Sequence, residues 1–188
     1  MTGDDTGTMK ATHVPPTGVE RKLGEDELIV TKTDPRGLLT YTNDVFLRIS
    51  ALREDEAIGQ PHNIIRHPEM PRAVFKLLWE TIGDRREVFA YVQNLALDGA
   101  HYWVLAHVTP SVDEHGQLVG YHSSRRRPDD AAVAEISRIY ADLRAEELRH
   151  AASPAGLDAS WAMLQRLLDD RGQTYDAFVW SLTNGALR

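Results

Sequence analysis

The sequence predicts an α+β fold: a five-stranded antiparallel sheet with short helices over one face, followed by a helical region at the C-terminus. Three observations predict this fold. Two short β-like runs precede short helical patterns, and three longer β-like runs separated by turn residues follow them. The last third of the chain has the spacing of amphipathic helices. Helices packed on one face of such a sheet leave room for a ligand cavity between the two layers.

The first hairpin is expected over residues 27–42. The turn signal Asp34-Pro35-Arg36-Gly37 separates its two β-like runs. Asn43 or Asp44 can then cap the first helix, because a short polar side chain accepts a hydrogen bond from the backbone of the first turn. A second short helix ends at Gly59.

The segment 60–71 is the centre of the predicted domain. It holds three prolines, two histidines, an arginine and a carboxylate between helical patterns. Proline fixes φ, so this backbone is held in place. Arg66 and His67 beside apolar neighbours can hold an anionic or aromatic ligand against a pocket wall. The alternative is a helix–helix connector whose prolines only set an angle. Pro71 can open the next helix, which Gly83 ends.

Three further strands are expected over 88–95, 101–109 and 118–125. Turns at Asp98–Gly99 and Asp113–Gln117 separate them. Side chains alternate between the faces of a strand, so one face of the first of these strands carries small apolar residues and then Asn94. That face suits a cavity wall with a single polar side chain that can recognise a ligand. The alternative is an asparagine that closes the strand end by bonding to the backbone.

The chain ends divide into a tail and a helical extension. We expect a flexible N-terminal tail over 1–24, a folded domain over 25–128 and a C-terminal helical extension over 129–188. Helices are predicted over 131–150, 158–169 and from 175 onward. The extension has no basic face, so we do not expect a helix-turn-helix reader of DNA.

Composition excludes several function classes. The chain has 188 residues, no cysteine and a formal net charge of −7. Disulfides, thiolate metal sites and thiol nucleophiles are therefore excluded, and a general nucleic-acid binder is not expected. No apolar run approaches membrane-spanning length, so we expect a cytoplasmic protein without membrane insertion. The eight histidines form no chelating pattern, and no catalytic constellation is present, so we do not expect an enzyme.

Several motifs resemble the PAS sensor domain of bacterial aerotaxis receptors. The resemblance runs from about Asp26 to Arg127 and rests on the motifs Asn43-Asp44-Val45-Phe46, Gly59-Gln60-Pro61-His62-Asn63, Arg66-His67-Pro68-Glu69-Met70-Pro71, Trp79, Asn94 and His101-Tyr102-Trp103-Val104. It implies a PAS fold, non-covalent FAD binding and a report of redox or oxygen state. The cofactor-binding residues that it implies are Asn43, Arg66, His67, Glu69, Trp79 and Asn94.

The sequence departs from the family pattern at two positions, 69 and 88. Glu69 stands where relatives have aspartate, and Val88 stands where FAD-binding relatives carry a tryptophan that packs on the flavin. Phe89 cannot replace that tryptophan directly, because a shift by one residue turns a strand side chain to the opposite face. Haem held by a single histidine, His67 or His122, is the alternative cofactor.

The expected function is that of a stand-alone sensor. It would signal the redox state of FAD through its helical extension to a downstream signalling protein, because no output segment is recognised in the chain. The alternatives are a haem-binding gas sensor and a cofactor-free dimerisation module. The outer sheet face is apolar at His101, Trp103 and Leu105, so an N-terminal cap, the C-terminal helices or a second subunit should cover it. We favour a homodimer.

Overall fold

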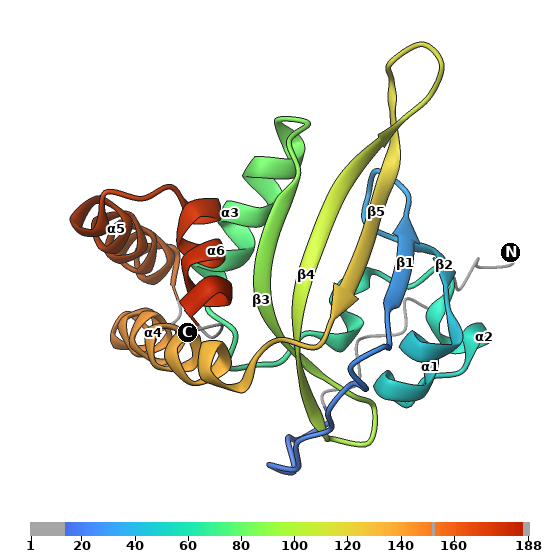
Figure 1. Cartoon of the computed structure of the whole chain (residues 1–188), viewed down its shortest axis with the longest axis horizontal. Helices are drawn as coiled ribbons and strands as arrows, with labels where there is room; N and C mark the ends of the chain where they lie inside the picture. Colours follow the sequence, from blue (N-terminus) through green and yellow to red (C-terminus); the bar gives the residue numbers. More distant parts are fainter. Residues whose placement is uncertain (1–13, 152, 186–188) are drawn as a thin grey trace, which may run out of the picture.

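The computed structural model describes residues 14–151 and 153–185, and it places the sheet at the centre of the molecule (Figure 1). The strand order is β2-β1-β5-β4-β3, and every neighbouring pair is antiparallel. The prediction of a five-stranded antiparallel sheet is confirmed. The strands are β1 (Ile29–Thr33), β2 (Leu39–Thr42), β3 (Val88–Leu95), β4 (His101–Val112) and β5 (Leu118–Arg126).

Two groups of helices surround the sheet, as Figure 1 shows. The first group follows β2 and covers the inner face; it consists of α1 (Asp44–Ser50), α2 (Glu54–Ala57), the 3₁₀ turn η1 (His62–Ile65) and α3 (Arg72–Gly83). The second group lies beside β3 and consists of α4 (Asp130–Arg149), α5 (Pro154–Arg171) and α6 (Tyr175–Gly185). No helix in the described ranges has both the length and the apolar character needed to span a membrane.

Polar caps begin and end several of these helices as the sequence predicts. The Asn43 side chain accepts hydrogen bonds from the backbone N–H groups of Phe46 (3.2 Å) and Val30 (3.0 Å), so it caps α1 and ties it to β1. Thr174 accepts a hydrogen bond from Ala177 N at the start of α6. Gly172 ends α5 in the left-handed region at φ +59°.

Two element boundaries differ from the expected ones. β4 continues through Pro110 to Val112, and its register shifts between Ser111 and Val112, where pairing with β5 ends. α5 begins at Pro154 rather than at residue 158. The Ser153-Pro154 pair reads as a break in the sequence, but proline at the first helical position costs no hydrogen bond, so it starts the helix here.

The C-terminal helices cover the part of the outer sheet face that β3 and β4 form. Tyr140 of α4 donates a hydrogen bond to the carbonyl oxygen of Tyr91 (2.8 Å) and lies against the Trp103 ring at 6.1 Å. Trp180 of α6 packs against Phe89 at 4.8 Å. The C-terminal helices of the same chain, one of the three covers expected for this apolar face, therefore cover it in part.

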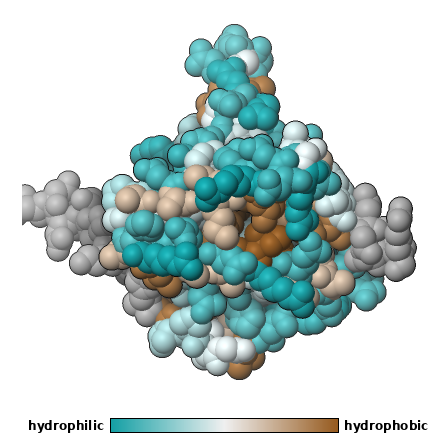
Figure 2. Space-filling view, turned by 90° about the vertical axis from the view of Figure 1, so that its left-hand side faces the viewer, coloured by the Kyte–Doolittle hydropathy of each residue, from teal (hydrophilic) through white to brown (hydrophobic). Residues whose placement is uncertain are grey.

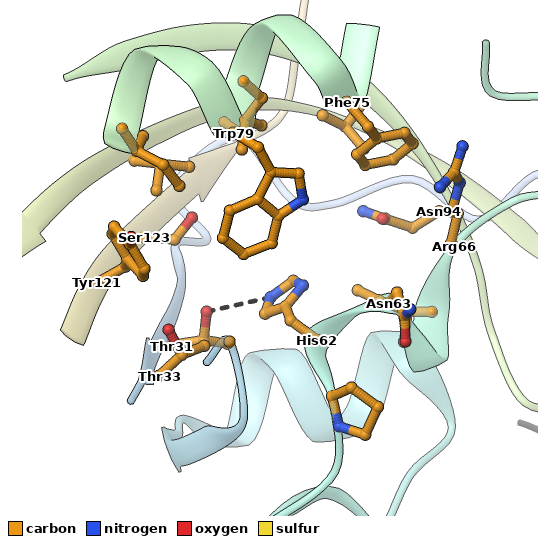
Figure 3. Close-up of a pocket in the computed structure, with 18 of the residues that line it drawn as sticks. Thr31, Thr33, His62, Asn63, Arg66, Phe75, Trp79, Asn94, Tyr121 and Ser123 are labelled. Carbon is orange, nitrogen blue, oxygen red and sulfur yellow. Dashed lines mark hydrogen bonds between the residues drawn. The ribbon is translucent and has the colours of Figure 1, made fainter. Parts of the chain in front are cut away.

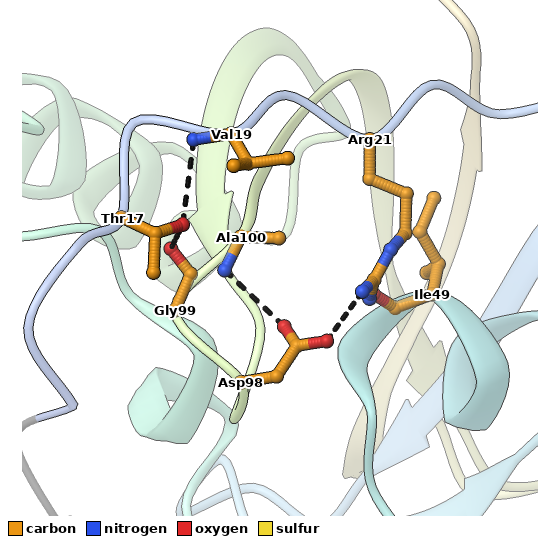
Figure 4. A network of polar contacts seen from close by, with 7 residues as sticks. All are labelled: Thr17, Val19, Arg21, Ile49, Asp98, Gly99 and Ala100. Carbon is orange, nitrogen blue, oxygen red and sulfur yellow. Dashed lines mark hydrogen bonds and ion pairs between the residues drawn. The ribbon is translucent and has the colours of Figure 1, made fainter.

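Residues 14–24 pair with the start of β4, whereas a mobile tail was expected there. The backbone N–H of His101 donates to Val19 O, and Arg21 N donates to His101 O. The Arg21 guanidinium donates to Ile49 O (2.7 Å) and pairs with Asp98 (2.5 Å), as Figure 4 shows. The sequence did not predict this ordered segment, because it has few apolar residues and is held by backbone hydrogen bonds. Residues 1–13 of the predicted tail lie outside the described residues.

Candidate functional site

A cavity of about 220 Å³ lies between the inner sheet face and the helices over it (Figure 3). The strands contribute the lining residues Thr31, Thr33, Val92, Asn94, Ala106, Val108, Tyr121, Ser123 and Arg125. The turn before β2, η1 and α3 contribute Arg36, Gly37, Pro61, His62, Asn63, Ile65, Arg66, Phe75, Leu78, Trp79 and Ile82. The cavity is thus where the inner face of the sheet meets the proline-rich segment.

Strand alternation decides which side chains reach the cavity. Val92 and Asn94 of β3 line it, while Phe89 and Tyr91 point to the outer face, where they contact α6 and α4. The predicted cavity wall on β3 is confirmed for Val92 and Asn94. Val88 shares their face, but it is fully buried and lies outside the lining, so the position of the family tryptophan belongs to the core here.

Arg125 is a buried cation at this cavity. It is 5% exposed, and its Nη2 donates to Thr31 Oγ1 (3.0 Å) and to His62 Nε2 (2.5 Å). Its Nη1 is buried and has no hydrogen-bond partner among the residues that the structure describes. Burial lowers the pKa of Arg125 from 12.5 to about 10, which corresponds to a cost on the order of 3 kcal/mol for keeping the charge. A buried charge without a counter-charge calls for an acceptor or an anion.

His62 is held neutral beside this cation. Burial first, and then the charge of Arg125, lower the pKa of His62 well below its usual 6.5. A neutral Nε2 can accept the hydrogen bond from Arg125, and the same nitrogen lies 3.4 Å from Thr31 Oγ1. The imidazole therefore acts as the acceptor that orients the guanidinium toward the cavity.

We expect this histidine to make stability fall on mild acidification. Its folded pKa lies below the unfolded value of 6.5, so the unfolded chain takes up a proton first as pH falls. Stability is therefore fully present above pH 6.5, and His62 alone should remove up to about 1.4 kcal/mol per pH unit below it. Urea unfolding between pH 7.5 and 5.5 measures the slope, which His62→Gln should reduce. His115→Gln, at an exposed turn position, should keep the wild-type slope.

The proline-rich segment closes the edge of the sheet at β3. Arg66 forms an isolated antiparallel bridge with Asn94, and Met70 Sδ accepts a hydrogen bond from Gln93 N (3.3 Å). This contact brings Asn94 and Arg66 to the same end of the cavity, as Figure 3 shows. Asn94 is 4% exposed, and within the described ranges its Nδ2 has no hydrogen-bond partner. An amide donor is thus available to a ligand.

Aromatic rings form another part of the cavity wall, and one of them, Phe75, lies next to Arg66. The Trp79 indole extends from α3 toward the middle of the cavity and lies edge-on to Tyr121 at 5.9 Å (Figure 3). It is 47% exposed, so it stands at the mouth. The Arg66 guanidinium lies 4.0 Å from the Phe75 ring centroid, a cation–π geometry. Burial lowers the pKa of Arg66, while the nearby Glu147 carboxylate opposes this effect.

Three of the six residues named from the sequence line the cavity: Arg66, Trp79 and Asn94. Asn43 lies outside it and caps α1. Glu69 is exposed and also lies outside the lining. His67 is buried at 3% exposure, where its Nδ1 accepts from Glu69 N and its ring lies 5.9 Å from that of His101. Burial lowers the pKa of His67, consistent with a neutral, structural imidazole.

The sequence reasoning missed two buried polar residues that line the cavity. Arg125 and Ser123 follow Tyr121 at alternate positions of β5, so strand alternation could have found them. The expected strand 118–125 does include Arg125, but neither residue was assigned to the cavity from the sequence; β5 itself continues to Arg126. In the described part of the chain, no group of three or more metal-binding side chains comes together.

The chain is similar to known sensor proteins. It is 37% identical to the aerotaxis receptor of Escherichia coli (strain K12) over 123 residues, and 27% identical to a nitrogen fixation regulatory protein of Klebsiella pneumoniae over 97 residues. These matches cover 65% and 52% of this chain. The chain spans only 24% and 20% of the lengths of the two relatives.

Solved structures share the fold. A light-oxygen-voltage domain studied with a flavin analogue superposes with a TM-score of 0.53 at 14% identity, over 59% of this chain and 83% of that chain. An RNA-binding light-oxygen-voltage receptor superposes with a TM-score of 0.51 at 21% identity, over 67% of this chain and 35% of that one. The PAS fold family itself matches residues 29–123, about half of the chain. The expected succession of two strands, short helices and three further strands is present, and the chain belongs to the PAS fold family.

Proposed function

We propose that this protein is a PAS sensor that binds FAD non-covalently in the cavity and signals redox or oxygen state to a partner through its C-terminal helices. Signal transduction is the usual role of the family. The binding of FAD, the existence of a partner and the route of the signal through the C-terminal helices are our proposal. The cytoplasmic location stays a prediction from the sequence.

One observation carries the proposal of a polar aromatic ligand. In residues 14–151 and 153–185, six buried side-chain polar atoms have no hydrogen-bond partner, and four of them belong to residues that line this one cavity. The four are Thr33 Oγ1, Asn94 Nδ2, Ser123 Oγ and Arg125 Nη1. A buried polar atom left without a partner costs roughly 1–3 kcal/mol. Their concentration at one place supports a ligand that supplies the missing partners.

A flavin ring fits this set of groups. One edge of an isoalloxazine ring carries two carbonyl oxygens and an N–H, and the other edge is apolar. The amide of Asn94 can both donate and accept at the polar edge, and Arg125 can donate to a carbonyl oxygen. Phe75, Trp79 and Tyr121 supply an aromatic wall, in place of the tryptophan missing at Val88. Arg66 and Arg36 provide cations for the diphosphate of FAD.

The geometry favours haem less. Of the two histidines considered as haem ligands, His67 packs on His101, and His122 lies on the face of β5 opposite to Ser123 and Arg125. His62 does line the cavity, but its Nε2 already accepts a hydrogen bond from a cation. The binding of iron would have to break that contact.

The C-terminal helices are the proposed output and the proposed dimer surface. Figure 2 views the molecule from the side of these helices and shows a mainly hydrophilic surface with a hydrophobic area near its middle. Leu148 of α4 is 56% exposed, and Trp161 and Met163 of α5 are only partly buried. We propose that a second copy or a signalling partner covers this area. Light scattering distinguishes the dimer from the monomer.

Arg125→Met tests the cofactor site, because it should weaken FAD binding without weakening the fold. The variant removes a buried charge that has no counter-charge, so the ligand-free protein should be at least as stable as the wild type. Its affinity for FAD should fall at least about tenfold, since the lost contact is charge-assisted. Flavin absorbance after reconstitution and titration of fluorescence measure the affinity, and urea unfolding measures the stability.

The neighbouring Arg126 provides a matched control. It is exposed at the end of β5 and points to the other face, so Arg126→Met should leave FAD affinity unchanged. Asn94→Ala and Arg66→Ala should also lower flavin occupancy. If Arg125→Met and Asn94→Ala bind FAD like the wild type, the site assignment is wrong. A colourless wild-type protein that takes up no flavin would favour the cofactor-free dimerisation module, and a Soret band would favour haem.

A further inference from the structure

A carboxylate of the C-terminal extension lies completely buried against the sensor domain. The side chain of Glu147, on the last turns of α4, is 0% exposed. Its Oε1 accepts hydrogen bonds from the backbone N–H groups of Arg72 (2.6 Å) and Ala73 (3.2 Å), more than 70 residues earlier in the chain. Its Oε2 accepts from Arg144 Nη1 at 3.3 Å. A buried charge with this many partners is a specific contact between two parts of the chain.

The two N–H groups belong to the first turn of α3. That helix begins after Pro71, whose side chain provides no cap, so its first N–H groups need acceptors from elsewhere. Glu147 supplies a negative charge where the helix dipole is positive. A second contact holds the same place, because Arg72 Nη1 donates to the carbonyl oxygen of Ser153, between α4 and α5. The extension thus fixes the start of α3.

The start of α3 is also where the cavity wall begins. Phe75, one turn further along, lines the cavity and carries the Arg66 guanidinium on its ring. The charge of Glu147 raises the pKa of Arg66 against the lowering effect of burial, so the carboxylate acts on a cavity-lining cation. Trp79, a further turn along the same helix, stands at the mouth. Glu147 therefore lies one contact away from the ligand-binding wall.

We propose that Glu147 is the positioning residue that couples occupancy of the cavity to docking of the C-terminal helices. Docked helices hold the first turn of α3, and this turn holds Phe75 and Arg66 in the geometry that binds the ligand. Coupling between two sites is reciprocal, so an occupied cavity must tighten the docking of α4 by the same factor. This inference rests on flavin binding as proposed above, and it adds the residue through which the signal leaves the sensor domain.

Affinity for FAD in three variants of the full chain tests the positioning role. Glu147→Ala removes both hydrogen bonds to α3 and should lower FAD affinity by about 5- to 150-fold, the usual range of coupling between sites. Glu147→Asp is one methylene too short and should behave like Glu147→Ala. Glu147→Gln keeps an oxygen that can accept from Arg72 N and Ala73 N, so it should recover most of the affinity. This order of affinities would show that the effect comes from the hydrogen bonds to α3 and not only from the loss of the negative charge.

Glu146 provides the matched control on the same helix. Its carboxylate pairs with Arg149 and His150, near the end of the same helix, instead of with the start of α3. Glu146→Ala should bind FAD like the wild type. If the folded Glu147→Ala and Glu147→Asp variants bind FAD as tightly as Glu146→Ala, Glu147 only supports the fold and the proposal is overturned.

Hydrogen exchange gives a readout that needs no substitution. Addition of FAD to the wild-type chain should slow amide exchange in residues 143–149 of α4, and unchanged exchange there would overturn the coupling even if Glu147→Ala fails to fold. If the wild-type chain takes up no FAD, the proposed function fails by itself. The coupling is then tested by amide exchange of η1 in the ligand-free protein. Glu147→Gln should leave this exchange near that of the wild type. Glu147→Asp should make it faster than in Glu146→Ala. Equal exchange in the three variants would overturn it.

Discussion

A chain that ends after Pro128 should be insoluble or unfolded. Removal of α4–α6 uncovers Tyr91, Phe89 and Trp103 on the outer sheet face and takes away the cap on α3. Three aromatic side chains returned to water correspond to a loss on the order of 5–10 kcal/mol. This is as large as the whole free energy of unfolding of a typical domain, about 5–15 kcal/mol. Soluble yield, dye binding to apolar surface and circular dichroism measure the effect.

A rescue experiment distinguishes lost contacts from a general effect of truncation. If the helices act by covering the sheet, the separate segment 129–188 should restore solubility when it is expressed together with the shortened chain. A soluble, monomeric and cooperatively folding 1–128 chain would contradict the prediction. It would mean that the contacts of Tyr140 and Trp180 with the sheet contribute little to stability.

Gly120→Ala should destabilise the protein by more than about 3 kcal/mol. Gly120 lies in β5 at φ +156°, and an added Cβ would come within 2.0 Å of the carbonyl oxygen of Thr33 in β1. The added Cβ is fixed to the backbone of β5, and the oxygen belongs to the backbone of β1. Neither atom can move away alone, so the two strands would have to separate. β5 also carries Ser123 and Arg125 into the cavity, and a shift of this strand should reduce ligand binding as well. Urea unfolding measures the loss.

Gly116 in the same hairpin provides the control for backbone conformation. It also has positive φ, +73°, but nothing lies within 4 Å of an added Cβ. Gly116→Ala should therefore cost only the conformational term, about 1 kcal/mol. Equal destabilisation by the two substitutions would show that the close approach to Thr33 is not the cause.

Strand patterns predicted most of the sheet and part of the site. Alternation along 88–95 placed Asn94 on the cavity face, and the turn residues at Asp98–Gly99 and Asp113–Gln117 located the meander. Arg66 and Trp79 were found through the family motif and line the cavity. These residues are accessible to sequence reasoning because a repeating local pattern, or a short motif, fixes their direction.

Long-range contacts explain what the sequence reasoning did not find. Arg125 ends the last strand expected from the sequence, and no local pattern indicates that its cation is buried at the cavity. Glu147 sits in a charged helix segment beside Glu146, and only the docking of α4 on α3 makes one of the two buried. Asn43 matches a family motif, yet a cap at α1 accounts for its hydrogen bonds here. Tertiary packing decides the cases of Arg125 and Glu147, whereas the cap formed by Asn43 is a local contact that the sequence predicts.

The position of Trp79 makes the cavity visible by fluorescence. Of the four tryptophans, all within the described ranges, Trp79 alone lines the cavity, whereas Trp103, Trp161 and Trp180 pack against Tyr140, Lys76 and Phe89 elsewhere. An aromatic ring that enters the cavity comes into contact with this half-exposed indole and quenches its emission, while the three remaining indoles supply a constant background. Entry and exit rates can therefore be followed by stopped flow on the unlabelled protein.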